Sequence, residues 1–146
     1  MRKSPLLLGT DTERDGATRM AIARMSIGGT LMFPGLARRL FGIPENQDSG
    51  SLRMLARLFG VRNIVLGAWA LMARDQGPEE RLLCYRLNAV VDTVDVVALA
   101  WGGATGEGLV QAAVMGSSLG LSAAVAWVEL ASDVGSADTE GSVALA

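Results

Sequence analysis

Apolar residues gather in four segments of the chain, separated by short polar stretches. The segments cover residues 19–37, 52–73, 82–102 and 109–130. Each has about the ~20 residues that a helix needs to cross the ~30 Å hydrocarbon layer of a membrane. The last segment carries no charged side chain between Leu109 and Val128. The pattern therefore predicts an all-α fold, a four-transmembrane-helix antiparallel bundle.

The polar stretches have compositions that end helices. Proline, glycine, asparagine and aspartate concentrate in residues 42–51, 74–80 and 102–108. Such short stretches favour tight connections between antiparallel helices. The predicted organisation is a flexible N-terminal segment, a transmembrane domain and a disordered C-terminal tail, over residues 1–16, 17–131 and 132–146. A soluble four-helix bundle is the alternative, but it needs a charged outer face on every helix, and the fourth segment has none.

Composition excludes several classes of function. Thirteen basic and fifteen acidic residues give a net charge of −2, with three Phe and one Tyr, so we expect no nucleic-acid partner. The chain has no histidine, which excludes His-based triads and His-ligated zinc. Cys84 is the single cysteine, and we expect a small buried residue there, not a nucleophile. The sequence predicts no cofactor and no metal ion.

The distribution of basic residues indicates an orientation in the membrane. With four spans, both termini and the second loop share one side of the membrane, and the other two loops share the opposite side. The first side has six basic residues: Arg2, Lys3, Arg14, Arg19, Arg74 and Arg81. The second has four: Arg38, Arg39, Arg53 and Arg57. The positive-inside rule therefore predicts a multi-pass protein of the cell membrane with both termini in the cytoplasm.

Ionisable residues inside the apolar segments are the strongest candidates for a site. Tyr85, Asn88, Asp92 and Asp95 are spaced three, four and three residues apart, so they share one helix face. Arg62 lies near the middle of the second segment, as Asp92 does in the third. A charge at the bilayer centre costs about 2.5–3.5 kcal/mol, and such residues usually face the bundle interior. We expect Arg62 to reach Asp92 or Asp95 through two hydrogen bonds.

These charges do not balance by themselves. Two acids and one arginine leave one negative charge over, unless one Asp is protonated or a second arginine approaches. A separate set of charged residues is predicted to lie nearer one membrane surface: Arg24, Arg86 and Glu129. We expect an interfacial salt bridge that fixes packing, with a functional role as the alternative. The three tryptophans fall near span ends, where aromatic residues often sit at the interface: Trp69, Trp101 and Trp127.

Small residues mark the places where helices can approach closely. The second segment has a stripe of such positions that includes Asn63: Ala56, Gly60, Asn63, Gly67 and Ala70. The fourth has a ridge at every fourth position: Ala112, Gly116, Gly120 and Ala124. That ridge permits contact within the chain or a homo-oligomer through Gly116 and Gly120. In the first segment, Gly28-Gly29 followed by Pro34 predicts a kink or a close crossing.

Three short motifs carry a resemblance to a known group of proteins. They are Leu40-Phe41-Gly42-Ile43-Pro44, then Gly60-Val61-Arg62-Asn63 with Leu66-Gly67, then Asp92-x-x-Asp95. The region from Met20 to Leu130 resembles small bacterial four-helix membrane proteins catalogued as a domain of unknown function. The resemblance implies a four-helix integral membrane fold in which the Arg-Asn and Asp-x-x-Asp elements face inward. It implies no particular activity.

One functional hypothesis is a cofactor-free acid–base enzyme. Asp92 and Asp95 would transfer protons, and Arg62 would hold the ionised acid and separate the two groups in acidity. The expected supporting or substrate-binding residues are Asn63, Asn88, Tyr85 and Trp69. The partners would be membrane lipid and a lipophilic small molecule, such as an isoprenoid or a polyketide. The reaction would be an isomerisation, an epoxide opening or a cyclisation.

The other hypothesis is non-catalytic. The same polar residues would form a structural clasp that fixes the helix register, or a binding site in a transport or assembly complex. The surroundings of Asp92 discriminate between the two. A cavity open to lipid or to one water face, lined by Trp, Met and Leu, favours an enzyme or a lipid-binding role. A closed contact with every polar atom paired favours the clasp.

Overall fold

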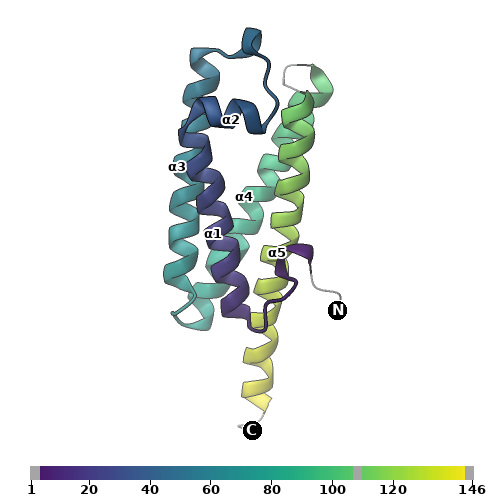
Figure 1. The fold of residues 1–146 in the computed structure, drawn as a ribbon. Helices are drawn as coiled ribbons and strands as arrows, with labels where there is room; N and C mark the ends of the chain where they lie inside the picture. The colour runs from purple at the N-terminus through teal and green to yellow at the C-terminus, as the bar shows by residue number, and fades with distance from the viewer. Residues whose placement is uncertain (1–3, 107–109, 144–146) are drawn as a thin grey trace.

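A computed structural model describes residues 4–106 and 110–143, with side chains as far as residue 136. The described part is all-α (Figure 1). Its helices are α1 (Glu13–Met32), α2 (Pro34–Leu40), α3 (Gly50–Ala73), α4 (Pro78–Thr105) and α5 (Val110–Val143). Two single turns of 3₁₀-helix, Pro5–Leu7 and Glu45–Gln47, precede α1 and α3.

Local sequence signals set most of the helix ends. Thr12 caps α1, where its hydroxyl accepts a hydrogen bond from the Asp15 amide at 3.1 Å. Ser49 caps α3 in the same way, with the Leu52 amide at 3.2 Å. Such caps satisfy amides that the first turn of a helix leaves without partners. Gly106 ends α4 with a φ of 74°, a left-handed conformation that glycine adopts without strain.

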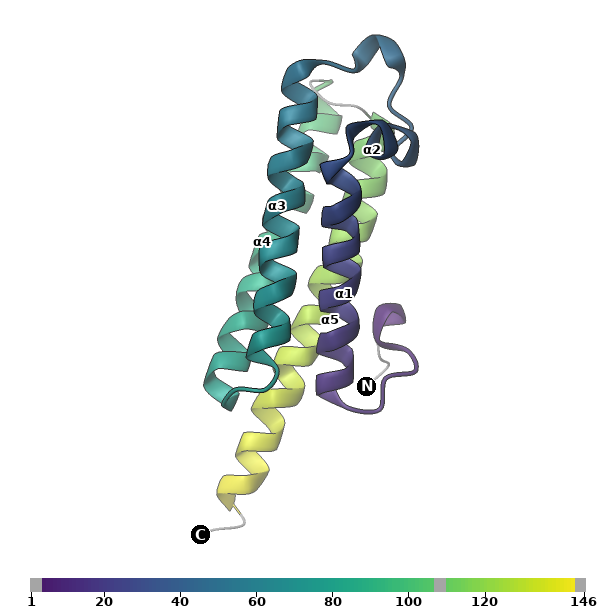
Figure 2. The same cartoon turned by 60° about the vertical axis from the view of Figure 1, so that its left-hand side comes forward.

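The four long helices alternate in direction along the chain and lie side by side (Figures 1 and 2). α1 packs chiefly against α3, and α4 packs chiefly against α5, while contacts between these two helix pairs are fewer. α1 begins and α5 ends at the same end of the bundle, beyond which the last turns of α5 project. The antiparallel arrangement agrees with the sequence-based prediction.

The buried core lies toward the end where α1 and α4 begin. Its largest fully buried side chains include Trp127, Tyr85 and Leu130, and small residues such as Ala17, Ala21 and Ala70 fill the space between the helices. The N-terminal 3₁₀ turn covers this region, since Leu7 is only 3% exposed.

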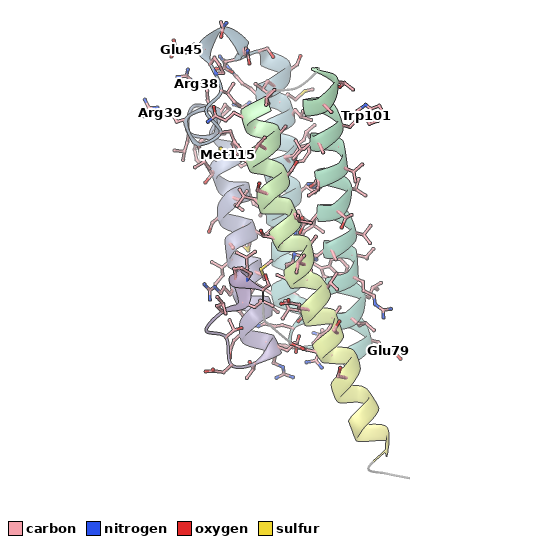
Figure 3. The ribbon with its side chains drawn as sticks, turned by 90° about the vertical axis from the view of Figure 1, so that its right-hand side faces the viewer. Arg38, Arg39, Glu45, Glu79, Trp101 and Met115 are labelled. Carbon is pink, nitrogen blue, oxygen red and sulfur yellow. The ribbon has the colours of Figure 1, made fainter. Side chains whose placement is uncertain are left out.

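Large apolar side chains point outward along the whole bundle. Val90, Val94 and Val97 are each more than half exposed on α4, and Trp101 is 70% exposed and projects away from the helix (Figure 3). Buried polar residues lie on the inner side, with Arg24, Asn88 and Asp92 each at most 6% exposed. The many exposed apolar side chains depart from the charged outer face of a soluble bundle, although the core remains mainly apolar.

Two of the described helices, α3 and α5, are long and apolar enough to cross a membrane. The number rises to three if α1 and α2 are counted as one broken span. α4 is not among these candidate spans. Its 28 residues are long enough to cross a ~30 Å hydrocarbon layer at 1.5 Å per residue, but it carries Asp92 and Asp95 near its middle.

The first predicted segment is not one straight span. α1 ends at Met32, and after Phe33 the chain turns so that α2 lies at 114° to α1. Pro34 is the first residue of α2. Proline is tolerated in the first turn of a helix but disrupts the helix interior, so it begins a new helix here. The kink predicted at Pro34 is therefore confirmed, whereas the single helix over 19–37 is wrong.

Helical structure extends further at both ends than the apolar segments predict. α1 begins at Glu13, inside the segment expected to be flexible, and α5 continues to Val143, inside the expected tail. The division into 1–16, 17–131 and 132–146 stays a prediction. Arg2, Lys3, Leu109 and residues 144–146, which enter the predictions above, lie outside the described residues.

Candidate functional site

Asp92 of α4 is held by an arginine from α1. Both terminal nitrogens of Arg24 donate to its carboxylate, Nη1 to Oδ2 at 2.8 Å and Nη2 to Oδ1 at 2.7 Å. The two side chains are only 5% and 8% exposed. This is the bidentate geometry in which a planar guanidinium binds a carboxylate most strongly.

Asp95, one turn further along α4, is held by Arg62 of α3. Again both terminal nitrogens donate, with Nη1 at 2.8 Å from Oδ1 and Nη2 in contact with Oδ2. This pair is less enclosed, since the side chain of Arg62 is 35% exposed and that of Asp95 is 18% exposed. The guanidinium also lies over the ring of Phe59, 4.5 Å from its centroid, a favourable cation–π geometry. Arg24, Arg62, Asp92 and Asp95 together are called the polar seam below.

The polar seam joins the two helix pairs. Each of its ion pairs runs from α1 or α3 on one side to α4 on the other. A third connection lies nearer the core end, where Glu13 of α1 accepts hydrogen bonds from Arg81 at 3.0 Å and from Tyr85 at 2.5 Å. These polar links therefore lie where direct contact between the helices is sparser.

Charge in the polar seam is balanced. The prediction that Arg62 reaches Asp92 or Asp95 is confirmed for Asp95, and Arg24 is the second arginine that the sequence-based charge count allowed. The predicted grouping of Arg24 with Arg86 and Glu129 is wrong. Arg86 is exposed, and Glu129 accepts a hydrogen bond from the Ser4 amide at 2.7 Å.

The cause of this error is the position of the first helix. A segment beginning at residue 19 puts Arg24 close to a membrane surface, but α1 begins at Glu13, which moves Arg24 to the middle of the helix. The sequence does contain a signal for the earlier start. Thr12 at the N-cap, followed three residues later by Asp15, is a helix-start pattern. The Asp15 amide donates to the Thr12 hydroxyl at 3.1 Å, and that hydroxyl donates to the Asp15 carboxylate at 2.7 Å.

The expected supporting residues use their hydrogen bonds elsewhere. Asn63 and Asn88 donate to backbone carbonyls of their own helices, those of Phe59 and Cys84, both at 2.9 Å. Tyr85 donates to Glu13, and Trp69 packs against the buried core. The side-chain oxygen of Asn88 is buried and has no hydrogen-bond partner among the described residues. A role of these four residues toward a substrate stays a prediction.

Cys84 and Trp127 are two further residues of the buried core. Cys84 is fully buried, as the sequence predicted. Trp127 is also fully buried, with its ring centroid 5.6 Å from that of Tyr85, so the predicted interfacial position of Trp127 is wrong.

Glycines allow the close helix contacts that hold each pair together. A Cβ placed on Gly28 of α1 would lie 2.6 Å from the Gly60 carbonyl oxygen of α3, and one on Gly67 would lie 2.8 Å from the Ala21 carbonyl oxygen. The predicted close approach along the second segment is thus confirmed. On α5, Gly116 and Gly120 face Leu99 and Val96 of α4 in the same chain. A homo-oligomer through Gly116 and Gly120 stays a prediction.

The chemistry of the polar seam is limited by this pairing. Both oxygens of Asp92 and both of Asp95 accept from arginine. Two cavities are described at the α2 end of the molecule, and neither is lined by Asp92 or Asp95. Within residues 4–106 and 110–136, no group of three or more Cys, Asp or Glu side chains is placed to hold a metal ion.

Comparison with known proteins adds no relative to this picture. No family model, no curated protein and no solved structure matches the chain.

Proposed function

We propose that the chain is a multi-pass protein of the cell membrane, with α1, α3, α4 and α5 as its four spans. The outward-facing apolar side chains and inward-facing polar seam support this, because lipid solvates the former and not the latter. The parity of four spans puts both termini on one side, and the excess of basic residues on that side favours the cytoplasm.

Membrane fractionation tests the location. The protein should stay with the membrane pellet after alkaline carbonate extraction and require detergent for release. Recovery of monodisperse protein in buffer without detergent would contradict the proposal.

Within that membrane protein, the polar seam is a non-catalytic structural clasp between the two helix pairs. A single observation carries this: both seam carboxylates are bound bidentately by arginines of the opposite pair. Arginine paired in this way compensates the carboxylate charge in a medium that lacks water. The clasp supplies helix register, since each arginine reaches its own partner.

Apolar replacement of the whole seam tests the clasp. Complete ion pairs can often be replaced by apolar residues of similar volume without loss of the fold, whereas an uncompensated buried charge is costly. The variant with Arg24→Met, Arg62→Met, Asp92→Leu and Asp95→Leu should therefore remain folded and monodisperse in detergent. Asp92→Leu alone leaves Arg24 without a counter-ion, so it should unfold at a lower concentration of denaturing detergent than the wild type or the fourfold variant. If the fourfold variant retains its fold but does not restore the growth or lipid composition of cells that lack the wild-type protein, the polar seam has a role beyond structure.

A cofactor-free acid–base enzyme is the second candidate. The observation that favours it is the partial exposure of Arg62 and Asp95, which leaves that pair accessible from the bundle surface. To test this candidate, lipophilic extracts are compared between cells that produce the wild-type protein and cells that produce Asp95→Asn. An enzyme predicts that the amount of at least one lipophilic metabolite differs between the two extracts. Identical extracts, at equal protein levels, would eliminate this candidate.

A further inference from the structure

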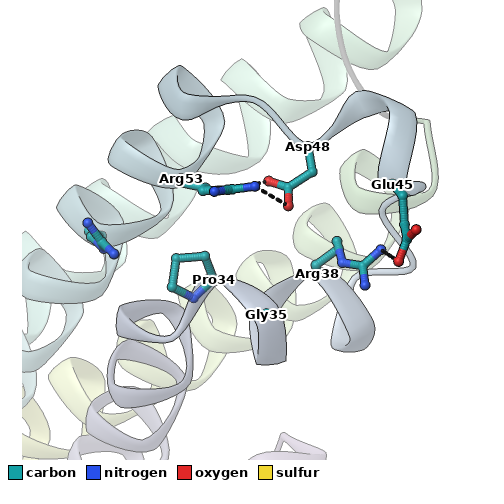
Figure 4. Close-up of a pocket in the computed structure, with 7 residues that line it drawn as sticks. Pro34, Gly35, Arg38, Glu45, Asp48 and Arg53 are labelled. Carbon is teal, nitrogen blue, oxygen red and sulfur yellow. Dashed lines mark hydrogen bonds and ion pairs between the residues drawn. The ribbon is translucent and has the colours of Figure 1, made fainter.

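A cavity of about 560 Å³ lies between α2 and the beginning of α3, at the end of the molecule opposite the core. Its charged lining consists of three arginines and two acids: Arg38, Arg53, Arg57, Glu45 and Asp48 (Figure 4). The volume falls in the range of roughly 300–1,000 Å³ that is typical of small-molecule sites.

Positive charge exceeds negative charge in this cavity. Asp48 accepts two hydrogen bonds from Arg53, at 2.9 and 3.0 Å, and Glu45 pairs with Arg38 at 2.9 Å (Figure 4). Arg57 has neither a hydrogen bond nor an ion pair among the described residues. One guanidinium is therefore left without a counter-ion.

The electrostatic field at this site favours anions. The hydrogen bond from Arg53 holds the pKa of the Asp48 carboxyl below its usual value, and the positive charges of Arg53 and Arg38 act in the same direction. Asp48 lies in the connection before α3, outside the membrane-spanning helices.

Apolar surface adjoins the basic cavity. A smaller hollow of about 50 Å³ shares Arg38, Asp48 and Arg53 with it and is otherwise lined mainly by apolar residues such as Phe41 and Leu52. α2 turns across the end of the bundle, and its exposed Leu36 and Leu40 are positioned next to Arg38 and Arg39. Apolar and basic side chains combined in this way are typical of elements at the membrane–water interface.

We propose that the cavity between α2 and α3 binds a phosphate group, carried by an anionic lipid headgroup or free in solution. Arginine forks match phosphate oxygens geometrically, and the unpaired Arg57 supplies the charge that Glu45 and Asp48 do not neutralise. The lipid form of the ligand rests on the proposed membrane location, because the headgroup would then lie at the level of α2. Binding of free phosphate does not depend on the membrane location.

Calorimetric titration of the detergent-solubilised full chain tests the proposal. The probes are inorganic phosphate, dioctanoyl phosphatidic acid and, as the zwitterionic control, dioctanoyl phosphatidylcholine. We expect saturable binding of a phosphate-bearing anion that Arg57→Gln weakens about tenfold, as loss of one charge-assisted hydrogen bond would. Arg39→Gln is the matched control, because Arg39 is exposed on α2 and does not line the cavity.

A second variant is expected to bind more tightly, a result that misfolding cannot produce. Asp48→Asn removes the carboxylate that competes for Arg53, so it should tighten binding. Saturable phosphatidic acid binding without phosphate binding identifies the lipid as the ligand, and binding of both identifies the phosphate group itself. No saturable binding of either, or equal weakening by Arg39→Gln and Arg57→Gln, would overturn the proposal. Membrane fractionation of Arg57→Gln distinguishes loss of the phosphate site from loss of the membrane location. If this variant stays in the membrane fraction, its weaker binding reflects the cavity.

Discussion

Asp92 and Asp95 lie one turn apart on α4, but their surroundings differ in access. The Arg24–Asp92 pair is almost fully enclosed, whereas about a third of the Arg62 side chain is exposed. An uncompensated charge is costly in both places, because Asp92 and Asp95 lie near the middle of α4. The Arg62 guanidinium, however, also lies 4.5 Å from the centroid of the Phe59 ring, a second favourable contact for its charge. The two pairs should therefore respond differently when one partner loses its charge.

Neutralising each acid in turn measures that difference. Asp92→Asn leaves Arg24 without a counter-ion inside the bundle and should lower the free energy of unfolding by about 3 kcal/mol. Asp95→Asn should cost about 1 kcal/mol, because the Phe59 ring, 4.5 Å from the Arg62 guanidinium, still partly compensates its charge. Unfolding in mixed micelles with increasing denaturing detergent gives both values. A larger loss for Asp95→Asn than for Asp92→Asn would contradict the assigned burial.

The helix pairs depend on glycine at specific positions. Gly28 and Gly29 are neighbours on α1, yet a Cβ on Gly28 would press on the Gly60 carbonyl oxygen while one on Gly29 would meet nothing within 4 Å. Close packing of backbones therefore fixes the α1–α3 crossing at Gly28.

These two glycines provide a matched pair of variants. Gly28→Ala should destabilise the protein by about 1–3 kcal/mol, since the backbones must separate. Gly29→Ala should be neutral or stabilising by about 0.5–1 kcal/mol, because alanine is the better helix former. Thermal unfolding in detergent measures both changes. Equal effects of the two substitutions would show that α1 and α3 do not cross there.

The helices were largely predictable from hydropathy, but their ends were not. An apolar segment marks the part of a helix that lipid can cover, whereas backbone hydrogen bonds continue into water until a cap or a breaker stops them. α5 therefore extends past Leu130 to Val143, and α1 begins at Glu13 and not at residue 19. That difference at α1 concealed the partner of Asp92.

Side-chain pairing across helices was predictable only where depth was estimated correctly. Arg62 lies in the middle of both the predicted segment and α3, and its pairing with Asp95 follows. Trp127 falls near the end of an apolar segment but lies within the longer α5, where it is buried against Tyr85. The sequence indicated a break at Pro34 but not its angle, so the cavity beside α2, which depends on the 114° turn after Phe33, could not be predicted.

At the scale of the whole molecule, exposure in the structure and accessibility to water should differ. Val94 is 60% exposed at the middle of α4, and in the proposed orientation lipid covers it. Ser51 at the start of α3 and Glu79 at the start of α4 are exposed at opposite ends of the bundle. If the protein spans a bilayer, cysteines introduced at these three positions should differ in their reactivity toward a water-soluble reagent.

Cysteine labelling reads out these reactivities. In a Cys84→Ala background, Val94→Cys should resist a water-soluble maleimide in membranes but react after denaturation. Ser51→Cys should react in intact cells, and Glu79→Cys only after the membrane is opened. Labelling of Val94→Cys as fast as Ser51→Cys would exclude a membrane-spanning α4. The reverse pattern for Ser51→Cys and Glu79→Cys would invert the orientation.

The pairing of charges across the two helix pairs can be measured by double-mutant cycles in bicelles. Leucine is placed at Arg24 and Asp92, singly and together, and likewise at Arg62 and Asp95. The coupling free energies should be about 2 kcal/mol for the enclosed Arg24–Asp92 pair and about 1 kcal/mol for the Arg62–Asp95 pair. The crossed cycles, Arg24 with Asp95 and Arg62 with Asp92, should show less than half of the matched values. Crossed couplings as large as the matched ones, or no coupling in any cycle, would mean that the two arginines and two aspartates do not clasp the bundle.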